Sequence, residues 1–242
     1  MCRMVGVVFK DDFPLGTLVD LRHVSQVGRI PGTKEPGHRD GWGIVSFRGG
    51  DPRYIGRSPR EAFLDPSYDS ALEDIPALDV PNIVIAHVRA ASKGGAVMMN
   101  THPFVVDGIV LGHNGTIHDF HPVTSRKPKG DTDSERLLLL LADRMSEKGD
   151  IKTALKSVIL EDLVKHKSSA AVLLVSDGKV LLGYRDYTKL PEYYDLRIAK
   201  CGSYVSLFQE TCLGYKTRTS QVKKGQLVSV GLDLKVRREM IR

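Results

Sequence analysis

Short apolar runs, each bounded by glycine, proline or charged residues, recur along the chain and predict β-strands. Residues 5–9, 42–47 and 82–88 form three such runs, and the first is rich in valine. The polar stretch between the first two runs contains Gly28, Pro31, Gly32, Pro36 and Gly37. This composition predicts a long loop, of the kind that often lies near a functional site.

Two later apolar segments are interrupted by Asp-Gly, which favours a type I′ turn between antiparallel strands. The interruptions are Asp107-Gly108 within residues 104–111 and Asp177-Gly178 within residues 170–184. Residues 204–208 and 227–236 also have the composition of strands, with a turn expected at residues 231–233. We therefore expect largely antiparallel sheets.

The middle of the chain has the pattern of two helices. Thr132-Asp133-Ser134-Glu135 matches a capping box, leucines follow at residues 137–141, and Gly149 marks the end of the helix. Asp150 can cap a second helix, whose apolar residues between 151 and 159 fall on one face. Strands, two helices and further strands predict an α+β layered domain. Since we find no internal repeat or linker, we expect a single domain over residues 1–242.

Composition and charge narrow the setting. The chain has 242 residues, of which 41% are hydrophobic, enough for a sizeable core. No stretch approaches the roughly 18 consecutive apolar residues of a membrane span, and the first residues lack the pattern of a signal peptide. The net charge is +6, but the basic residues are spread along the chain, and the basic segment at residues 126–129 is typical of solvated surface. We expect a cytoplasmic protein that binds neither membrane nor nucleic acid.

The three cysteines, Cys2, Cys201 and Cys212, lack the number and spacing of a disulfide framework or a zinc ribbon. We expect neither a metal nor another cofactor. Cys2 draws attention because aminopeptidases generally remove a methionine that precedes a small side chain. The new first residue would carry a thiol, with a pKa of about 8.5, and an α-amine, with a pKa of about 7.7–8.0, that can accept the thiol proton. An early cysteine can equally be an inert buried thiol.

Four segments rich in glycine and polar residues stand at the ends of predicted strands, at residues 38–43, 87–94, 100–104 and 113–116. Together with Met1-Cys2-Arg3 and residues 131–135, they make the chain resemble a class II glutamine amidotransferase domain, a type of N-terminal-nucleophile hydrolase. The motifs occur in the family's order and span residues 2–135. The resemblance implies a four-layer αββα sandwich with two mainly antiparallel sheets.

The resemblance also implies catalytic roles. Cys2 would be the nucleophile that forms a γ-glutamyl thioester, with its own α-amine as the base. The side-chain amide of Asn114 and the backbone N–H of Gly115 would form the oxyanion hole. Taken alone, an Asn-Gly pair is more often a hairpin turn.

Four residues are implied in substrate binding. Arg89 would bind the α-carboxylate of glutamine through two parallel hydrogen bonds, which lysine cannot reproduce. Asp133 would bind the ammonium group, although its place at a helix start also suits capping. His102 and Ser92 fall where the family contacts glutamine, but a histidine before proline can equally be a packed structural residue.

Three functions remain open. We favour a standalone hydrolase of glutamine or another γ-glutamyl amide, because residues 1–242 leave no room for a synthase domain. The alternatives are a glutaminase subunit that gives ammonia to a separate synthase, and a non-catalytic glutamine-binding module. The chain departs from the family pattern at Lys93 and Arg39, which leaves the roles of these two residues open, together with the oligomeric state.

Overall fold

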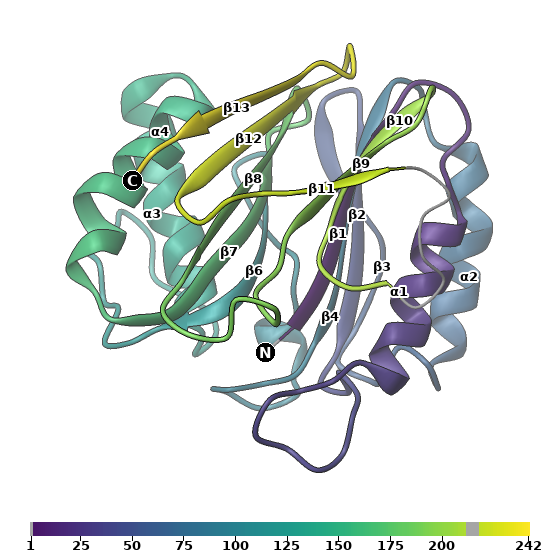
Figure 1. Cartoon of the computed structure of the whole chain (residues 1–242), viewed down its shortest axis with the longest axis horizontal. Coiled ribbons are helices and arrows are strands. Elements are labelled where there is room, and N and C mark those ends of the chain that lie inside the picture. Colours follow the sequence, from purple (N-terminus) through teal and green to yellow (C-terminus); the bar gives the residue numbers. More distant parts are fainter. Residues whose placement is uncertain (1, 212–217) are drawn as a thin grey trace.

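The computed structural model describes residues 2–211 and 218–242, which form four layers (Figure 1). Two antiparallel sheets pack face to face, and a pair of helices covers the outer face of each sheet. This arrangement confirms the expected α+β class and the αββα sandwich. Met1, whose removal is expected, and Cys212 lie outside the described part.

The described strands form two sheets. The first sheet has, among the described residues, seven strands in the order β11 (Thr219–Gln221), β9 (Arg197–Lys200), β10 (Tyr204–Phe208), β1 (Cys2–Phe9), β4 (Asn82–Arg89), β2 (Trp42–Arg48) and β3 (Asp51–Ser58). The second has six, in the order β13 (Val236–Met240), β12 (Gln226–Gly231), β8 (Val180–Tyr187), β7 (Ser168–Ser176), β6 (Ile109–Ile117) and β5 (Phe104–Val106). Strands β1 and β4 are central and buried along their whole length, which explains their continuous apolar runs.

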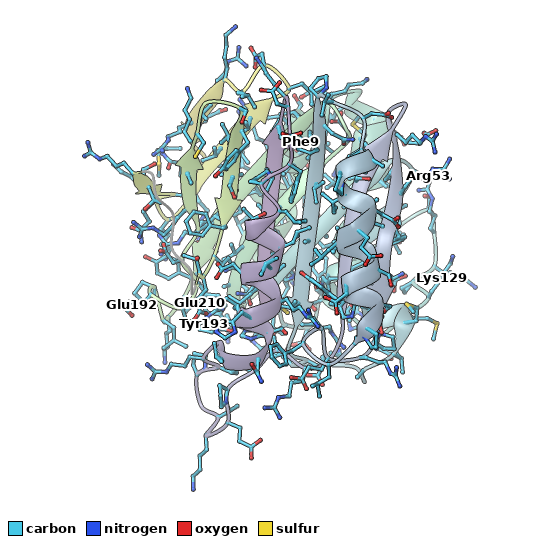
Figure 2. All side chains as sticks on the ribbon, turned by 90° about the vertical axis from the view of Figure 1, so that its right-hand side faces the viewer. Phe9, Arg53, Lys129, Glu192, Tyr193 and Glu210 are labelled. Carbon is cyan, nitrogen blue, oxygen red and sulfur yellow. The ribbon has the colours of Figure 1, made fainter. Side chains whose placement is uncertain are left out.

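Four helices form the outer layers. Helices α1 (Gly16–Val27) and α2 (Pro66–Asp74) cover the first sheet, as Figure 2 shows from that side. Helices α3 (Asp133–Lys148) and α4 (Ile151–Ser157) cover the second sheet (Figure 1). Helix α4 continues through a π turn (Val158–Asp162) into a 3-10 turn (Leu163–Lys165). Further 3-10 turns span Ile75–Ala77 and Met98–Asn100.

Three apolar cores fill the spaces between the layers. The core between the sheets includes Met4 and Val172, and the core beneath α3 and α4 includes the α3 leucines 137, 138, 140 and 141. In the third core, Trp42 packs edge-on against Tyr68 of α2 with ring centroids 4.7 Å apart. Each sheet is therefore covered on both faces. This packing holds the strands in place, and with them the polar segments at the strand ends.

The helix signals in the sequence are confirmed. The Thr132 hydroxyl accepts a hydrogen bond from the backbone N–H of Glu135 (3.2 Å), and α3 ends at Gly149 with a φ of 71°. Asp150 caps α4. One detail differs from a capping box, because the Glu135 carboxylate accepts from the backbone N–H groups of residues 129 and 130. Glu135 therefore anchors the preceding loop to the helix.

Both predicted hairpins form, but only the first has the predicted turn. Asp107 and Gly108 have φ values of 47° and 80°, as a type I′ turn requires. The second connection spans residues 177–179, where Gly178 has a φ of 83° and the Asp177 carboxylate accepts from the backbone N–H groups of residues 179 and 180. The type I′ prediction is wrong for this hairpin because its loop has three residues.

The long loop predicted after the first strand is partly wrong. Residues 16–27 form α1, and the loop occupies residues 28–41. Leu18, Leu21 and Val24 give α1 a narrow buried stripe, but the remaining residues are mostly polar. Strands β3, β9 and β11 and helix α2 were likewise not predicted, and the turn near residue 231 extends to residue 235.

Candidate functional site

Cys2 begins strand β1 and faces the space between the two sheets. It pairs with Arg89 on the neighbouring strand β4, and Asn114 reaches it from β6 of the opposite sheet. The backbone nitrogen of Cys2 donates to Asn114 Oδ1 at 2.9 Å, and its Sγ lies 4.0 Å from the carbonyl oxygen of Ala90. Cys2 is 6% exposed. Both sheets therefore contribute to the surroundings of this thiol.

Asn114 and Gly115 lie within strand β6, so this Asn-Gly pair is not a hairpin turn. The Asn114 Nδ2 donates to Gln209 Oε1 at 3.1 Å, which orients Oδ1 toward Cys2. The register between β6 and β7 shifts after Gly115, whose φ is 147°. A Cβ at this position would lie 1.9 Å from the carbonyl oxygen of Ala170, so only glycine fits.

Arg89 is buried, and its guanidinium binds backbone carbonyl groups. The Nη1 donates to Gly95 (2.9 Å), and the Nη2 donates to Lys93 (2.8 Å) and to Gly94 (3.3 Å). Arg89 therefore braces the loop that follows β4, directly beside Cys2. Binding of a substrate carboxylate by Arg89 stays a prediction.

Asp133 is the first residue of α3, and its Oδ2 accepts from the backbone N–H of Ile117 at 2.6 Å. Thr132 caps the helix, so Asp133 is not needed as the cap, as the sequence analysis allowed. The contact with Ile117 holds the end of β6 two residues beyond Gly115. The predicted ammonium-binding role of Asp133 remains open.

The other two predicted substrate contacts lie in different environments. His102 is 3% exposed, and its ring lies between His87 (4.4 Å) and Phe104 (4.5 Å), without a hydrogen bond from either ring nitrogen to a described residue. These contacts favour the packing alternative for His102. Ser92 is exposed, and its Oγ lies 3.0 Å from the hydroxyl oxygen of Thr116, next to Gly115.

Several residues that the sequence analysis did not single out support the site. The Asp40 carboxylate accepts from the backbone N–H of Ala91 (2.7 Å) and ties the 38–43 segment to the loop after β4. Arg3 is buried, donates to the carbonyl oxygen of Cys2 (2.9 Å) and forms an ion pair with Glu210. Its guanidinium also stacks on Tyr193, which Figure 2 shows near Glu210.

Asp40 belonged to a segment already noted for its polar residues. Gln209, which orients Asn114, and Glu210 had no comparable signal in the sequence. Arg39 and Lys93, whose roles the sequence left open, both lie at the protein surface. Arg39 is half-exposed and pairs with Glu61 at 3.7 Å. The Lys93 side chain is exposed, while its carbonyl oxygen binds Arg89.

The electrostatic environment favours ionisation of Cys2. Burial alone would raise the pKa of the thiol, but in the chain that retains Met1 the positive charge of the amino terminus and the imidazole of His87 lower this pKa to about 5. Burial lowers the pKa of His102 and of His113 below the usual imidazole range, so both rings are neutral at pH 7. The His113 Nδ1 lies 2.8 Å from the Ser134 hydroxyl oxygen. The site therefore combines a thiolate with neutral, packed histidines.

Across residues 2–211 and 218–242, no three His, Cys, Asp or Glu side chains are grouped as a metal site would require. In the same part of the chain, no helix has the length and apolarity needed to span a membrane.

The chain is similar in sequence to several known proteins. An uncharacterized protein of Methanocaldococcus jannaschii is 30% identical over 213 residues, covering 81% of this chain and 54% of that protein. A glutamine-fructose-6-phosphate aminotransferase of Xylella fastidiosa is 30% identical over 165 residues, covering 66% of this chain and 24% of that enzyme. This chain thus spans about half of the first relative and a quarter of the second.

The fold is also found among solved structures. The glutamine phosphoribosylpyrophosphate amidotransferase of B. subtilis superposes with a TM-score of 0.66 at 17% sequence identity, covering all of this chain and 49% of that one. The family model for class-II glutamine amidotransferases matches residues 1–201, which is most of the chain. The resemblance drawn from the motifs is thereby confirmed, and the chain belongs to the class-II glutamine amidotransferase family.

Proposed function

We propose that this chain is an amidohydrolase of glutamine or a related γ-glutamyl amide, acting through a γ-glutamyl thioester on Cys2. The observation that carries the proposal is the 2.9 Å hydrogen bond from the Cys2 nitrogen to Asn114 Oδ1. Removal of Met1 would convert this nitrogen into an α-amine that is already held beside its own thiol. We infer further that residues 1–242 act as one catalytic domain in the cytoplasm.

The reaction requires two chemical steps. The α-amine accepts the thiol proton, and the thiolate attacks the amide carbon of the substrate. The tetrahedral oxyanion then receives hydrogen bonds from Asn114 Nδ2 and from the Gly115 N–H, and its collapse expels ammonia or an amine that takes the proton from the α-ammonium group. Water hydrolyses the thioester, which releases the γ-carboxylate and returns the thiol. Gln209 Oε1, the present acceptor of Asn114 Nδ2, must share this donor with the oxyanion.

Arg89 and Asp133 are the proposed substrate anchors. Arg89 pairs with Cys2 across β1 and β4 and would bind the α-carboxylate, in exchange for some of its bonds to residues 93–95. Asp133 would bind the ammonium group with the carboxylate that now orients Ile117. Ser92, whose Oγ lies 3.0 Å from the Thr116 hydroxyl oxygen, and His102, whose ring packs on His87, stay proposed substrate contacts.

A second function is favoured by one observation. The Xylella fastidiosa relative is named as an aminotransferase, and this chain matches only 24% of its length. A glutaminase unit that gives ammonia to a separate synthase is therefore the alternative. Release of ammonia from glutamine by the purified chain alone supports the hydrolase, whereas release only after addition of a partner supports the ammonia donor.

The role of the α-amine can be tested by an insertion. A lysine inserted between Met1 and Cys2 should prevent removal of Met1, because aminopeptidases act before small residues. We expect the unaltered chain to lack Met1 by intact-mass measurement and the insertion variant to release ammonia at least about a hundredfold more slowly, since a positioned base contributes that much. Circular dichroism would verify that the variant folds. Equal rates in the two proteins would remove the α-amine from the mechanism.

The low thiol pKa predicts an unusual pH dependence of alkylation. In the chain that retains Met1, the pKa of Cys2 is lowered to about 5, so the thiol is protonated below this pH and is mostly thiolate at pH 7. Inactivation by iodoacetamide should therefore reach half of its maximal rate near pH 5, whereas an ordinary thiol would do so at about pH 8.5. Peptide mapping would locate the label on Cys2. A midpoint at the ordinary thiol value would contradict the predicted environment.

A further inference from the structure

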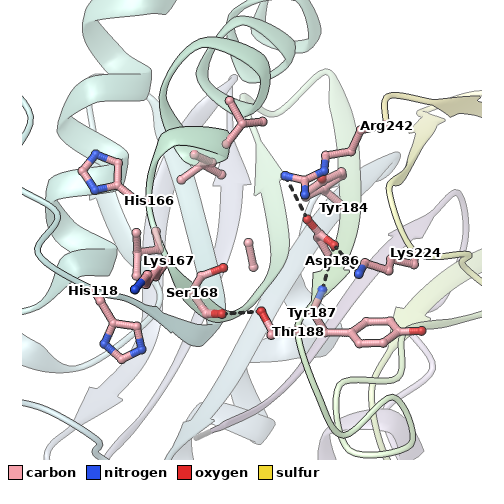
Figure 3. A pocket seen from close by; sticks show the side chains of 14 residues that line it. His118, His166, Lys167, Ser168, Tyr184, Asp186, Tyr187, Thr188, Lys224 and Arg242 are labelled. Carbon is pink, nitrogen blue, oxygen red and sulfur yellow. Dashed lines mark hydrogen bonds and ion pairs between the residues drawn. The ribbon is translucent and has the colours of Figure 1, made fainter.

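We propose that a second cavity, separate from Cys2, binds a small anion that carries a flat apolar group, such as an aryl phosphate or an aryl carboxylate. The cavity has a volume of about 420 Å³, within the usual range of small-molecule sites. It lies where β6 ends, β7 begins and β8 ends, beside the 3-10 turn Leu163–Lys165 (Figure 3). The inference does not depend on the proposed hydrolase activity.

The cavity lies on the opposite face of the second sheet from Cys2. Ile117, Ala171 and Tyr184 line it, and all three belong to the core between this sheet and helices α3 and α4. Asn114 instead points between the two sheets toward Cys2. A ligand in this cavity would therefore be separated from the thiol by the sheet itself.

The inner wall of the cavity is apolar. Ile117, Leu163, Ala171 and the ring of Tyr184 are buried there, while Val164 at its rim is 43% exposed. A flat apolar group could pack on this wall and cover Val164, which removes apolar surface from water.

The rim carries an excess of positive charge. Of the described residues that line the cavity, Asp186 is the only acid, and it already has Arg242 Nη1 at 3.4 Å and Lys224 Nζ at 3.9 Å. Lys167 faces them from the other side of the cavity, near His118 (Figure 3), and forms no ion pair with a described residue. Three cations around one neutralised carboxylate favour a ligand that brings a negative charge of its own.

A buried hydroxyl supplies a second, independent reason for a ligand. Tyr184 is 1% exposed, and its hydroxyl makes no hydrogen bond of normal geometry to a described residue. Burial and the nearby Asp186 charge raise the pKa of Tyr184, so the hydroxyl remains a proton donor at neutral pH. Asp186 is close enough to contribute to this raised pKa but is held by Arg242 and Lys224, so an oxygen of a bound anion could serve as the acceptor for the Tyr184 hydroxyl.

The experiment is a titration of the whole chain with phenyl phosphate, benzoate and inorganic phosphate, followed by calorimetry and ligand-observed NMR. We expect one phenyl phosphate per chain and at least tenfold weaker binding of inorganic phosphate, which lacks the apolar group. Tight binding of benzoate would indicate a carboxylate ligand in place of a phosphate ester. Failure of both aromatic anions to bind at millimolar concentration would overturn the proposal.

Matched charge reversals locate the ligand. Lys167→Glu and Lys224→Glu should each weaken phenyl phosphate at least tenfold, while Lys179→Glu, an exposed change in the β7–β8 hairpin, should leave its affinity within twofold. Tyr184→Phe should weaken binding severalfold without loss of thermal stability, because it removes only a hydroxyl without a hydrogen bond. Equal losses in all three lysine variants would indicate non-specific attraction and contradict the site. Loss of binding in Cys2→Ala would place the ligand at the candidate catalytic centre instead.

Discussion

Replacement of Cys2 by alanine should abolish ammonia release from glutamine while leaving the fold intact. The thiol is the proposed nucleophile, and loss of a nucleophile typically costs at least about a thousandfold in turnover. The change removes one sulfur atom, and the hydrogen bond from the backbone nitrogen to Asn114 Oδ1 does not involve the side chain. We therefore expect a stability loss of about 1 kcal/mol, as for other small truncations in a core.

The control for this variant is Cys201→Ala, which removes a thiol at the connection between β9 and β10. The backbone N–H of residue 201 donates to the carbonyl oxygen of Tyr204, and this bond does not involve the side chain. It should keep its turnover of glutamine within a factor of about two, as expected for a substitution away from the reacting atoms. Turnover would be measured as ammonia release, and folding by circular dichroism and thermal melting. Unchanged turnover in Cys2→Ala would rule out the thioester mechanism.

The same variant separates an enzyme from a binding module. If the chain only binds glutamine, calorimetry should give the same affinity in Cys2→Ala as in the unaltered chain, and neither protein should release ammonia. If the chain is a hydrolase, Cys2→Ala should still bind through Arg89 and Asp133 but should no longer react. The lowered pKa of the Cys2 thiol favours the hydrolase, because a protein that only binds glutamine does not require a reactive thiol.

The features that the sequence predicted correctly are those encoded over a few neighbouring residues. Three such features depend only on residues a few positions apart in the sequence. They are the capping interaction of Thr132, the end of α3 at Gly149 and the turn at Asp107-Gly108. Helix α1 was missed because its apolar stripe is narrow and includes the buried polar residues Asp20 and Ser25. Tertiary packing stabilises this helix more than its local sequence does.

The support around the candidate site could not be predicted in this way. Asn114 is oriented by Gln209, which lies 95 residues later, and Ala91 is held by Asp40, which lies 51 residues earlier. The first contact exists only once the two sheets face each other, and the second only once β2 and β4 pair within the first sheet. The motifs singled out Asn114 and Arg89, which lie beside Cys2, but not that the Arg89 guanidinium donates its hydrogen bonds to the loop at residues 93–95.

Substitution of Gly115 by alanine should damage both stability and catalysis. The φ of 147° is one that L-residues rarely adopt, and the new Cβ would lie 1.9 Å from the carbonyl oxygen and 2.5 Å from the carbonyl carbon of Ala170. Both are backbone atoms of β7, so the clash cannot be relieved by a side-chain rotation. We expect the free energy of unfolding to fall by about 2–5 kcal/mol, the combined cost of backbone strain and overpacking.

Catalysis should suffer for a separate reason, since any shift of β6 moves the Gly115 N–H away from the oxyanion. Loss of one such donor typically lowers kcat by about a hundred- to a thousandfold. Gly112→Ala is the matched control, because it lies on the same strand and its Cβ would meet the flexible end of Met4 at 3.2 Å. It should change stability by no more than about 1 kcal/mol and preserve turnover, since the Met4 side chain can adjust. Urea unfolding and ammonia release would measure both effects, and equal behaviour of the two variants would show that the conformation of Gly115 is not required. If Gly115→Ala loses stability but keeps its kcat, the strand needs this glycine for packing alone, and the oxyanion must be stabilised by another donor.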